Sequence, residues 1–89
     1  MNQDHCLVEQ FEMIFRAHFS SVKFFINTFL KSEADAEDLA QDVFVRLLDY
    51  KQMLRPDTVK YFLFTIARNI VTDYLRRYYK KQEVNNYIY

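Results

Sequence analysis

The sequence predicts an all-α fold, a compact bundle of three or more helices, on three observations. The chain contains no Gly and a single Pro, Pro56, so it lacks the turn residues that a sheet needs between its strands. Apolar residues recur at three- and four-residue intervals through most of its length. Its 89 residues are 51% hydrophobic, which supplies the dense apolar packing that a domain of this size requires. We therefore expect residues 1–89 to form a single helical domain.

The first predicted helix carries one apolar line at helical spacing. Its members are Leu7, Phe11, Ile14, Phe15, His18, Val22, Phe25, Ile26 and Phe29. A second helix follows, with apolar positions from Ala36 to Leu48. Ser32 or Asp35 can cap its start, and the acidic residues behind the cap suit the positive end of a helix dipole.

A third helix is expected after Pro56, with Asp57 or Thr58 as its cap and its end near Lys81. Apolar residues cover more than half of its circumference, so it either packs centrally against the other two helices or exposes an apolar strip to a partner. We expect the central position. Residues 51–56 form the loop before it, and residues 82–89 either extend it or fray. The predicted core draws on all three helices through Phe11, Phe15, Leu39, Val43, Leu47, Phe62, Ile66 and Ile70.

Charge is distributed unevenly, although the formal net charge is zero. Residues 31–50 hold six acids against two bases, and residues 60–81 hold six bases against one acid. The domain therefore has one surface suited to a cationic partner and another suited to an anion. On the third helix, six polar or aromatic residues fall within an arc of about 100° opposite its apolar line. This polar arc consists of Tyr61, Thr65, Arg68, Asn69, Thr72 and Arg76.

The sequence offers no chemistry that indicates an enzyme or a metal centre. His5, Cys6 and His18 provide no pair at three- or four-residue spacing, and a chain without Gly has no Gly-rich phosphate loop. A solvated face explains the acids of the second helix better than acid–base catalysis does. We expect no cofactor, no metal and no enzymatic activity. One cysteine, no signal peptide and no apolar stretch of about 20 residues predict a soluble cytoplasmic protein without a membrane span.

Two segments resemble the extracytoplasmic-function sigma factors of bacterial RNA polymerase. Residues 61–69, YFLFTIARN, followed by DYLRR at residues 73–77, are similar to the DNA-reading helix of that family. Residues 35–44, DAEDLAQDVF, are similar to its polymerase-binding helix, and the two motifs occur in the family's order and at its usual separation. Together with the first helix they cover nearly the whole chain. The resemblance implies the family's helical region 2 domain.

The resemblance also implies two partners. Region 2 binds the clamp helices of the largest subunit of core RNA polymerase, recognises the promoter's minus-ten element and captures the separated non-template strand. The positions that match the clamp contacts are Asp38, Gln41, Asp42 and Phe44. The positions that match the promoter-reading face are Ile66, Arg68 and Asn69. An anti-sigma factor is a further candidate partner.

The candidate DNA contacts extend beyond the matched positions. The polar arc and the basic end of the third helix add Tyr61, Thr65, Thr72, Arg76, Arg77 and Lys80. In the family, a flipped base is held by the loop that falls here on residues 51–57. The candidates for that role are Lys51, Met53, Leu54 and Arg55.

Two features depart from the family. Phe62 stands where the family usually has Trp, and this chain contains no Trp, which puts in doubt how it would wedge a duplex open. The family also has a C-terminal helix-turn-helix domain that reads the minus-thirty-five element, and this chain does not contain one. We expect either a fragment of a longer protein or a domain that cannot act alone at a full promoter.

Two other interpretations stay open at this point. One is a helical interaction module that holds a protein partner by its acidic second helix and does not bind DNA. The other is a helix-turn-helix repressor that binds duplex DNA, although the short turn expected before a recognition helix is not evident.

Overall fold

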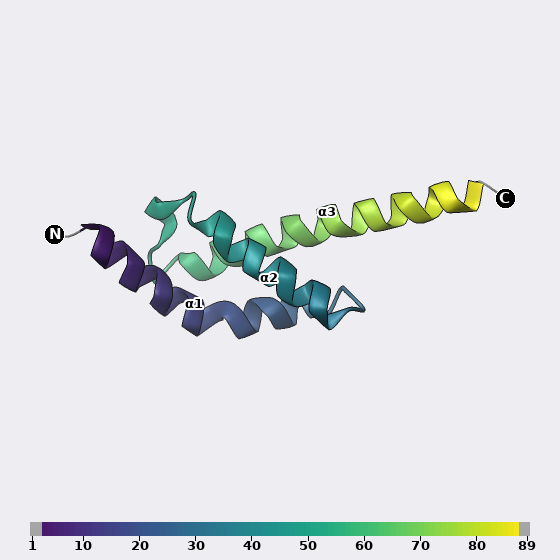
Figure 1. Cartoon of the computed structure of the whole chain (residues 1–89). Coiled ribbons are helices and arrows are strands. Elements are labelled where there is room, and N and C mark those ends of the chain that lie inside the picture. Colours follow the sequence, from purple (N-terminus) through teal and green to yellow (C-terminus); the bar gives the residue numbers. More distant parts are fainter. Residues whose placement is uncertain (1–2, 88–89) are drawn as a thin grey trace.

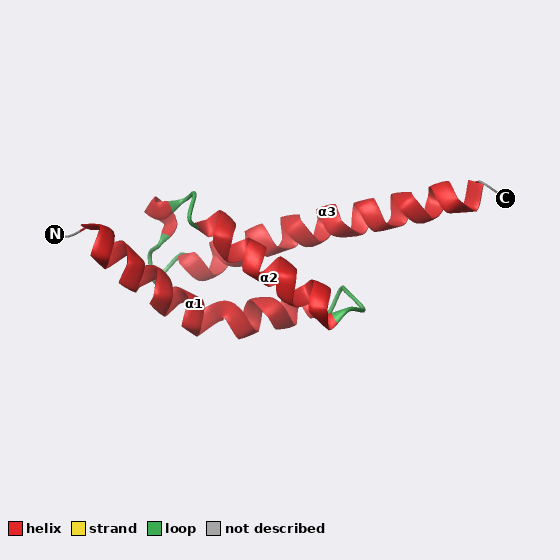
Figure 2. Ribbon diagram, in the orientation of Figure 1, coloured by secondary structure: helices red, strands yellow, loops and turns green. Residues whose placement is uncertain are grey.

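Three helices and one short 3-10 turn make up residues 3–87, which are the residues described by the computed structural model (Figure 1). The helices are α1 (Gln3–Asn27), α2 (Glu33–Leu47) and α3 (Val59–Tyr87), and the 3-10 turn η1 (Lys51–Met53) lies between α2 and α3. Short loops join the helices, and this part of the chain contains no strand (Figure 2). The prediction of an all-α bundle is confirmed. Residues 82–87 extend the last helix, and residues 88–89 of the predicted tail lie outside the described residues.

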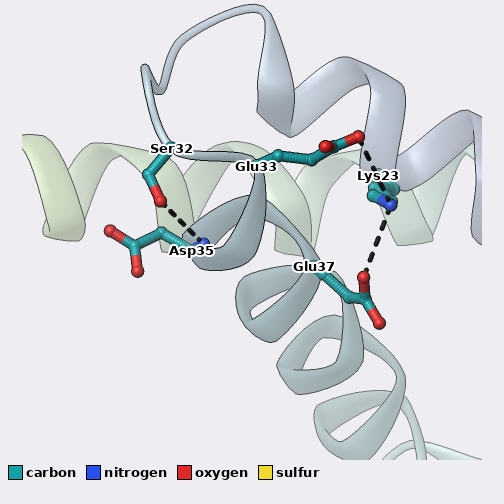
Figure 3. Close-up of polar contacts among 5 residues, drawn as sticks. All are labelled: Lys23, Ser32, Glu33, Asp35 and Glu37. Carbon is teal, nitrogen blue, oxygen red and sulfur yellow. Dashed lines mark hydrogen bonds and ion pairs between the residues drawn. The ribbon is translucent and has the colours of Figure 1, made fainter.

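The start of α2 is fixed by a side-chain cap. The Ser32 hydroxyl accepts a hydrogen bond of 3.2 Å from the backbone N–H of Asp35, so Ser32 is the cap of the two that the sequence offers (Figure 3). Lys23 of α1 lies between two carboxylates of α2, at 3.4 Å from Glu37 and 3.9 Å from Glu33 (Figure 3). These contacts fasten the first turns of α2 to the second half of α1.

The core is apolar and draws on all three helices. Val43, Leu47, Ile66 and Ile70 of the predicted core are buried. The other four predicted members, Phe11, Phe15, Leu39 and Phe62, are partly buried and pack against it. The largest side chains that are fully or almost fully enclosed are Phe44, Ile26, Leu47, Leu63, Val22, Val43 and Val59.

The central helix is α2, and the expectation of a central third helix is wrong. α2 packs against α1 and against α3 more extensively than α1 and α3 pack against each other. The broad apolar surface of α3 is not fully enclosed by the other helices. Its flanking residues Phe64 and Leu75 are only partly buried. The end of α3 projects beyond the other helices, which gives the molecule extents of 62 × 20 × 19 Å (Figure 1).

The connection between α2 and α3 is anchored to α1. Leu54 is buried, and its carbonyl accepts a hydrogen bond of 2.6 Å from the Gln10 side chain of α1. Thr58 directly precedes α3, and its carbonyl accepts a bond of 3.2 Å from the Phe62 N–H. Within residues 3–87, no residue has a positive φ angle and no peptide bond is cis. No helix in this range is long and apolar enough to cross a membrane.

Candidate nucleic-acid and polymerase interfaces

The polar arc of α3 forms one exposed surface. All six of its members are exposed, whereas Leu63, Ala67 and Ile70 on the opposite side of the helix are buried. α3 is one uninterrupted helix, so residues three and four positions apart lie next to one another along this surface. The structure therefore brings the aromatic ring, the amide, the hydroxyls and the cations of the arc together, as the sequence predicts.

The polar groups of the arc differ in whether they already form a hydrogen bond or an ion pair within the domain. The Thr65 hydroxyl donates a hydrogen bond of 2.9 Å to the Tyr61 carbonyl, so its proton is already used within the helix. Arg76 lies 3.8 Å from Asp73, but both side chains are exposed, and such pairs contribute little. The Asn69 amide has no hydrogen-bond partner among the residues that the structure describes. Asn69 is therefore available to a partner molecule.

Two of the predicted DNA-binding residues lie away from the arc. Ile66 is 7% exposed and faces the core, so it cannot itself contact DNA in this fold, and its assignment as a contact residue is corrected. The reason is helical phase, since Ile66 shares the side of α3 that holds Leu63 and Ile70. Arg77 is exposed on the side of α3 that faces α2, where it lines a cleft of about 330 Å³ with Asp42. Lys80 is exposed further along the helix.

The loop that was predicted to hold a flipped base is partly built into the core. Leu54 is 3% exposed, so its assignment as a base contact is corrected, while Lys51 and Arg55 are exposed. The side chain of Met53 lies outside the described residues. Lys51 and Leu54 line a hollow of about 540 Å³ that they share with the first turns of α1. The Tyr50 ring, directly before the loop, meets Phe62 edge-on, with ring centres 5.1 Å apart.

The outer face of α2 carries three of the four residues that were predicted to bind polymerase. Asp38, Gln41 and Asp42 are exposed on it. Phe44 is 2% exposed, and its assignment as a direct contact is corrected. Its ring lies within 5.0–6.4 Å, centre to centre, of the rings of three α1 residues, so it supports α2 from the inner side. Those residues are Phe11, Phe15 and Phe19.

One functional candidate on this face was missed by the sequence analysis. Val45 is 61% exposed and lies four positions after Gln41, and the partly exposed Leu48 follows it by three. The available signal was that Val45 does not belong to the apolar line that α2 presents to the core. An apolar residue in the middle of an acidic, exposed face is typical of the centre of a protein–protein interface.

Two pairs of acids on α2 differ in their surroundings. Glu33 and Glu37 share Lys23, as Figure 3 shows. Asp38 and Asp42 have no ion-pair partner among the side chains that the structure describes, which exclude residues 3–6, 53 and 81–87. The negative charge of Asp38 and Asp42 therefore remains available to an outside cation. Across the described part of the chain, His, Cys, Asp and Glu form no cluster of three that could hold a metal ion.

Comparisons with known proteins agree with this arrangement. The family model for sigma-70 region 2 matches residues 14–81, which include α2, the loop and most of α3. The ferric citrate uptake sigma factor FecI of Escherichia coli (strain K12) is 33% identical over 67 residues, which cover 75% of this chain and 39% of that protein. The chain thus spans about two fifths of the length of that relative, and no solved structure matches it. The chain belongs to the sigma-70 region 2 family and is the region 2 domain of an extracytoplasmic-function sigma factor.

Proposed function

We propose that this domain acts in transcription initiation by binding core RNA polymerase through α2 and promoter DNA through α3. One observation carries the proposal: the two helices present chemically different exposed faces outside one shared core. The α2 face is acidic with an apolar centre, and the α3 face is cationic, aromatic and rich in hydrogen-bonding groups. Two such surfaces can be occupied at the same time. Sigma factors are regulators of transcription and not enzymes, in agreement with the sequence analysis.

The α2 face suits the clamp helices of the largest polymerase subunit. Asp38 and Asp42 offer unpaired carboxylates to cationic groups, and charge-assisted hydrogen bonds are the stronger kind. Gln41 between them can both donate and accept. Val45 adds apolar area at the middle of the face, where binding free energy concentrates.

The α3 face suits an unpaired promoter strand. Arg68 and Arg76 are exposed cations that can contact phosphates, and such contacts position DNA without reading its sequence. Asn69 lies beside them with a free amide that offers both a donor and an acceptor to a base edge. Recognition of the minus-ten element therefore depends on Asn69 more than on the cations.

Strand separation requires a place for an extruded base. The hollow beside the loop, with Lys51 on its rim, is large enough for a base, and Arg55 is exposed on the same loop. Stacking on an aromatic ring is worth about 1–3 kcal/mol per base, and unpairing a base costs a few kcal/mol. Because the two values are comparable, capture of one base in this hollow would favour the open strand.

Strand binding by point variants tests the proposal. A library of single-stranded oligonucleotides is first selected on the wild-type domain in complex with core polymerase, which defines a preferred strand. Fluorescence anisotropy then compares this strand with a shuffled one. Asn69→Ala should weaken the preferred strand and leave the shuffled strand unchanged. Arg76→Ala should weaken both and flatten the salt dependence by about 0.7 in slope, as expected for one lost phosphate contact.

Two outcomes contradict the proposal in different ways. If Asn69→Ala lowers the affinity for both strands equally, Asn69 does not read sequence. If the wild type binds polymerase but selects no strand at all, the domain is an interaction module that does not bind DNA.

A further inference from the structure

A pocket lies where the loop between α1 and α2 meets the outer part of α3. Its volume is about 460 Å³, which lies within the usual range of ligand sites. Aromatic side chains line much of it, and Asp35 of α2 lines it with them. The aromatic residues of this pocket are Phe29, Tyr74, Tyr78 and Tyr79, and we refer to it as the aromatic pocket.

The carboxylate of Asp35 is held in place with most of its hydrogen-bonding capacity unused. Asp35 is half-buried, and its Oδ2 accepts a hydrogen bond from the Tyr74 hydroxyl. A carboxylate offers about four acceptor sites on its two oxygens, and no other described side chain donates to them. Within the described part of the chain, Asp35 also has no ion-pair partner. A positively charged donor from another molecule would therefore complete its hydrogen bonding.

The aromatic rings around Asp35 are suited to a cation as well. Phe29, Tyr78 and Tyr79 are each about half exposed, so part of each ring is open to a ligand. The rings of Tyr78 and Tyr79 meet edge-on, with their centres 5.6 Å apart. The face of an aromatic ring attracts a cation, and the attraction grows when the cation is partly removed from water. Rings beside a fixed carboxylate are therefore a combination that binds a cation on an apolar stem.

Lys31 is the other charged residue that lines the aromatic pocket. It is exposed, and among the described side chains no ion pair joins it to Asp35. Its flexible stem lets the ammonium turn into the solvent when another cation enters, whereas Asp35 is fixed by Tyr74. A phosphate would meet the carboxylate of Asp35, and like charges at close range are costly. The pocket therefore favours a cation over a nucleic acid.

We propose that the aromatic pocket binds an arginine side chain of a partner polypeptide. A planar guanidinium stacks on aromatic rings and pairs with a carboxylate through two hydrogen bonds, whereas a lysine ammonium is a point charge without this geometry. Because the outer rings are half exposed, a small free cation would stay mostly in water, and a polypeptide supplies the further contacts that offset the cost of association. No member of the polar arc lines the pocket, nor do Asp38, Gln41 and Asp42, so it is separate from both faces of the proposed function.

Peptide selection tests the proposal before the partner is identified. A random library of displayed peptides is selected on the wild-type domain and depleted on Asp35→Asn, which keeps an acceptor for Tyr74 and removes the charge. The enriched peptides should share an arginine. In a synthetic copy of one such peptide, replacing this arginine by alanine should weaken binding to the wild type by about 10- to 150-fold. The same replacement should change binding to Asp35→Asn by less than about twofold, and lysine should restore only part of the affinity.

Variants of the rings supply an independent measurement with matched controls. Tyr79→Leu should weaken the arginine peptide by about 2- to 30-fold, and Tyr79→Phe should keep its affinity, because the ring carries the interaction. Tyr61→Leu and Asp38→Asn alter an exposed ring and an exposed acid outside the pocket, so both should bind like the wild type. Lys31→Met should bind as tightly as the wild type or more tightly, because a like charge is removed. Circular dichroism confirms that each variant keeps its helices.

Four outcomes overturn the inference. The first is that no peptide prefers the wild type to Asp35→Asn, or that the peptides with this preference lack arginine. The second is that Tyr61→Leu costs as much affinity as Tyr79→Leu, which would assign binding to exposed rings in general. The third is weaker peptide binding by Lys31→Met, because the pocket would then hold an anion.

The fourth outcome concerns the polymerase face. Tyr79→Leu is also tested against the clamp fragment of the largest polymerase subunit, and its affinity should equal that of the wild type. If this variant weakens clamp binding, the aromatic pocket belongs to the polymerase face and is not a separate site, while the proposed function stands. If the wild type binds neither the clamp fragment nor DNA but still binds the arginine peptide through Asp35, the proposed function fails and the pocket remains.

Discussion

The hydroxyl of Tyr74 in α3 donates a hydrogen bond of 2.9 Å to Oδ2 of Asp35 in α2, across 39 positions of sequence. The backbone N–H of the same Asp35 is bound by the capping hydroxyl of Ser32. One residue therefore joins the start of the central helix to the helix that carries the proposed DNA face. Both partners are only partly buried, so this is a contact of moderate strength.

Removing the Tyr74 hydroxyl should loosen this junction. Tyr74→Phe keeps the ring and deletes the donor, so we expect the free energy of unfolding to fall by about 1 kcal/mol. For a domain of this size, that corresponds to a Tm about 4–8 °C lower in a thermal melt. Tyr61→Phe is the matched control, because Tyr61 is exposed, and it should leave the Tm unchanged. Equal melting of Tyr74→Phe and the wild type would show that the hydrogen bond does not stabilise the fold.

The same contact makes stability depend on alkaline pH. The hydrogen bond to Asp35, with a smaller contribution from burial, raises the pKa of Tyr74 above its ordinary value of 10.0. The native state then keeps a proton that the unfolded state releases, so stability falls as pH rises. The advantage of the wild type over Tyr74→Phe should be full below pH 10 and disappear as pH rises through the folded pKa. Urea titrations of both proteins from about pH 8 upward measure it, and a difference that stays constant would contradict this assignment.

Core packing can be tested with two leucines of different burial. Leu63 is completely buried in α3, and Leu63→Ala should lower the free energy of unfolding by about 2–5 kcal/mol. Leu48 is 44% exposed, and Leu48→Ala should change it by less than about 1 kcal/mol. Chemical denaturation gives both values. Similar losses at the two sites would mean that α3 is not packed as described.

The proposed polymerase face can be tested with two double variants that have the same net charge. Asp38→Asn with Asp42→Asn removes two unpaired carboxylates and should weaken binding to a clamp fragment about tenfold or more, which is about 1.4 kcal/mol. Glu33→Gln with Glu37→Gln removes the same charge from the two acids that share Lys23, and should have a much smaller effect. Biolayer interferometry measures both affinities. If the two double variants weaken binding equally, then overall charge and not this face determines it.

Val45 provides an uncharged test of the same face. Because its side chain is exposed, Val45→Ser should leave the Tm within a few degrees of the wild type. If Val45 lies at the centre of the interface, the affinity for the clamp fragment should fall by more than about fivefold, or roughly 1 kcal/mol. A variant that binds like the wild type would place the interface elsewhere on α2.

Local patterns were enough to predict the helices and the polar arc. The residue types at the start of α2 limited the cap to Ser32 or Asp35, of which the structure has Ser32, and the 3.6-residue period predicted the exposed arc of α3. These features depend on residues close together in the sequence. Which helix lies at the centre depends instead on contacts between residues far apart in the sequence. The sequence alone therefore led to the wrong expectation that α3 is central. Its broad apolar surface is instead left partly uncovered at Phe64 and Leu75.

Three residues that were assigned by motif alone have a different place in the structure. Phe44, Leu54 and Ile66 lie within or beside exposed functional residues in the sequence, yet each points into the core. A motif records which positions matter and does not distinguish a residue that touches a partner from one that supports the contact from inside. Phe29 was placed on the apolar line of the first helix, whereas α1 ends at Asn27 and Phe29 is 50% exposed.

The turns of this chain have a consequence for its unfolded state. Within residues 3–87 no backbone position requires a positive φ angle, and the whole sequence contains no Gly. Gly loses more conformational freedom on folding than any other residue, so an unfolded chain without it has fewer conformations to give up. A small domain gains stability in this way without any added contact in the folded state. Introducing Gly into an exposed turn, as in Arg55→Gly, would therefore destabilise the domain by enlarging the ensemble of the unfolded chain.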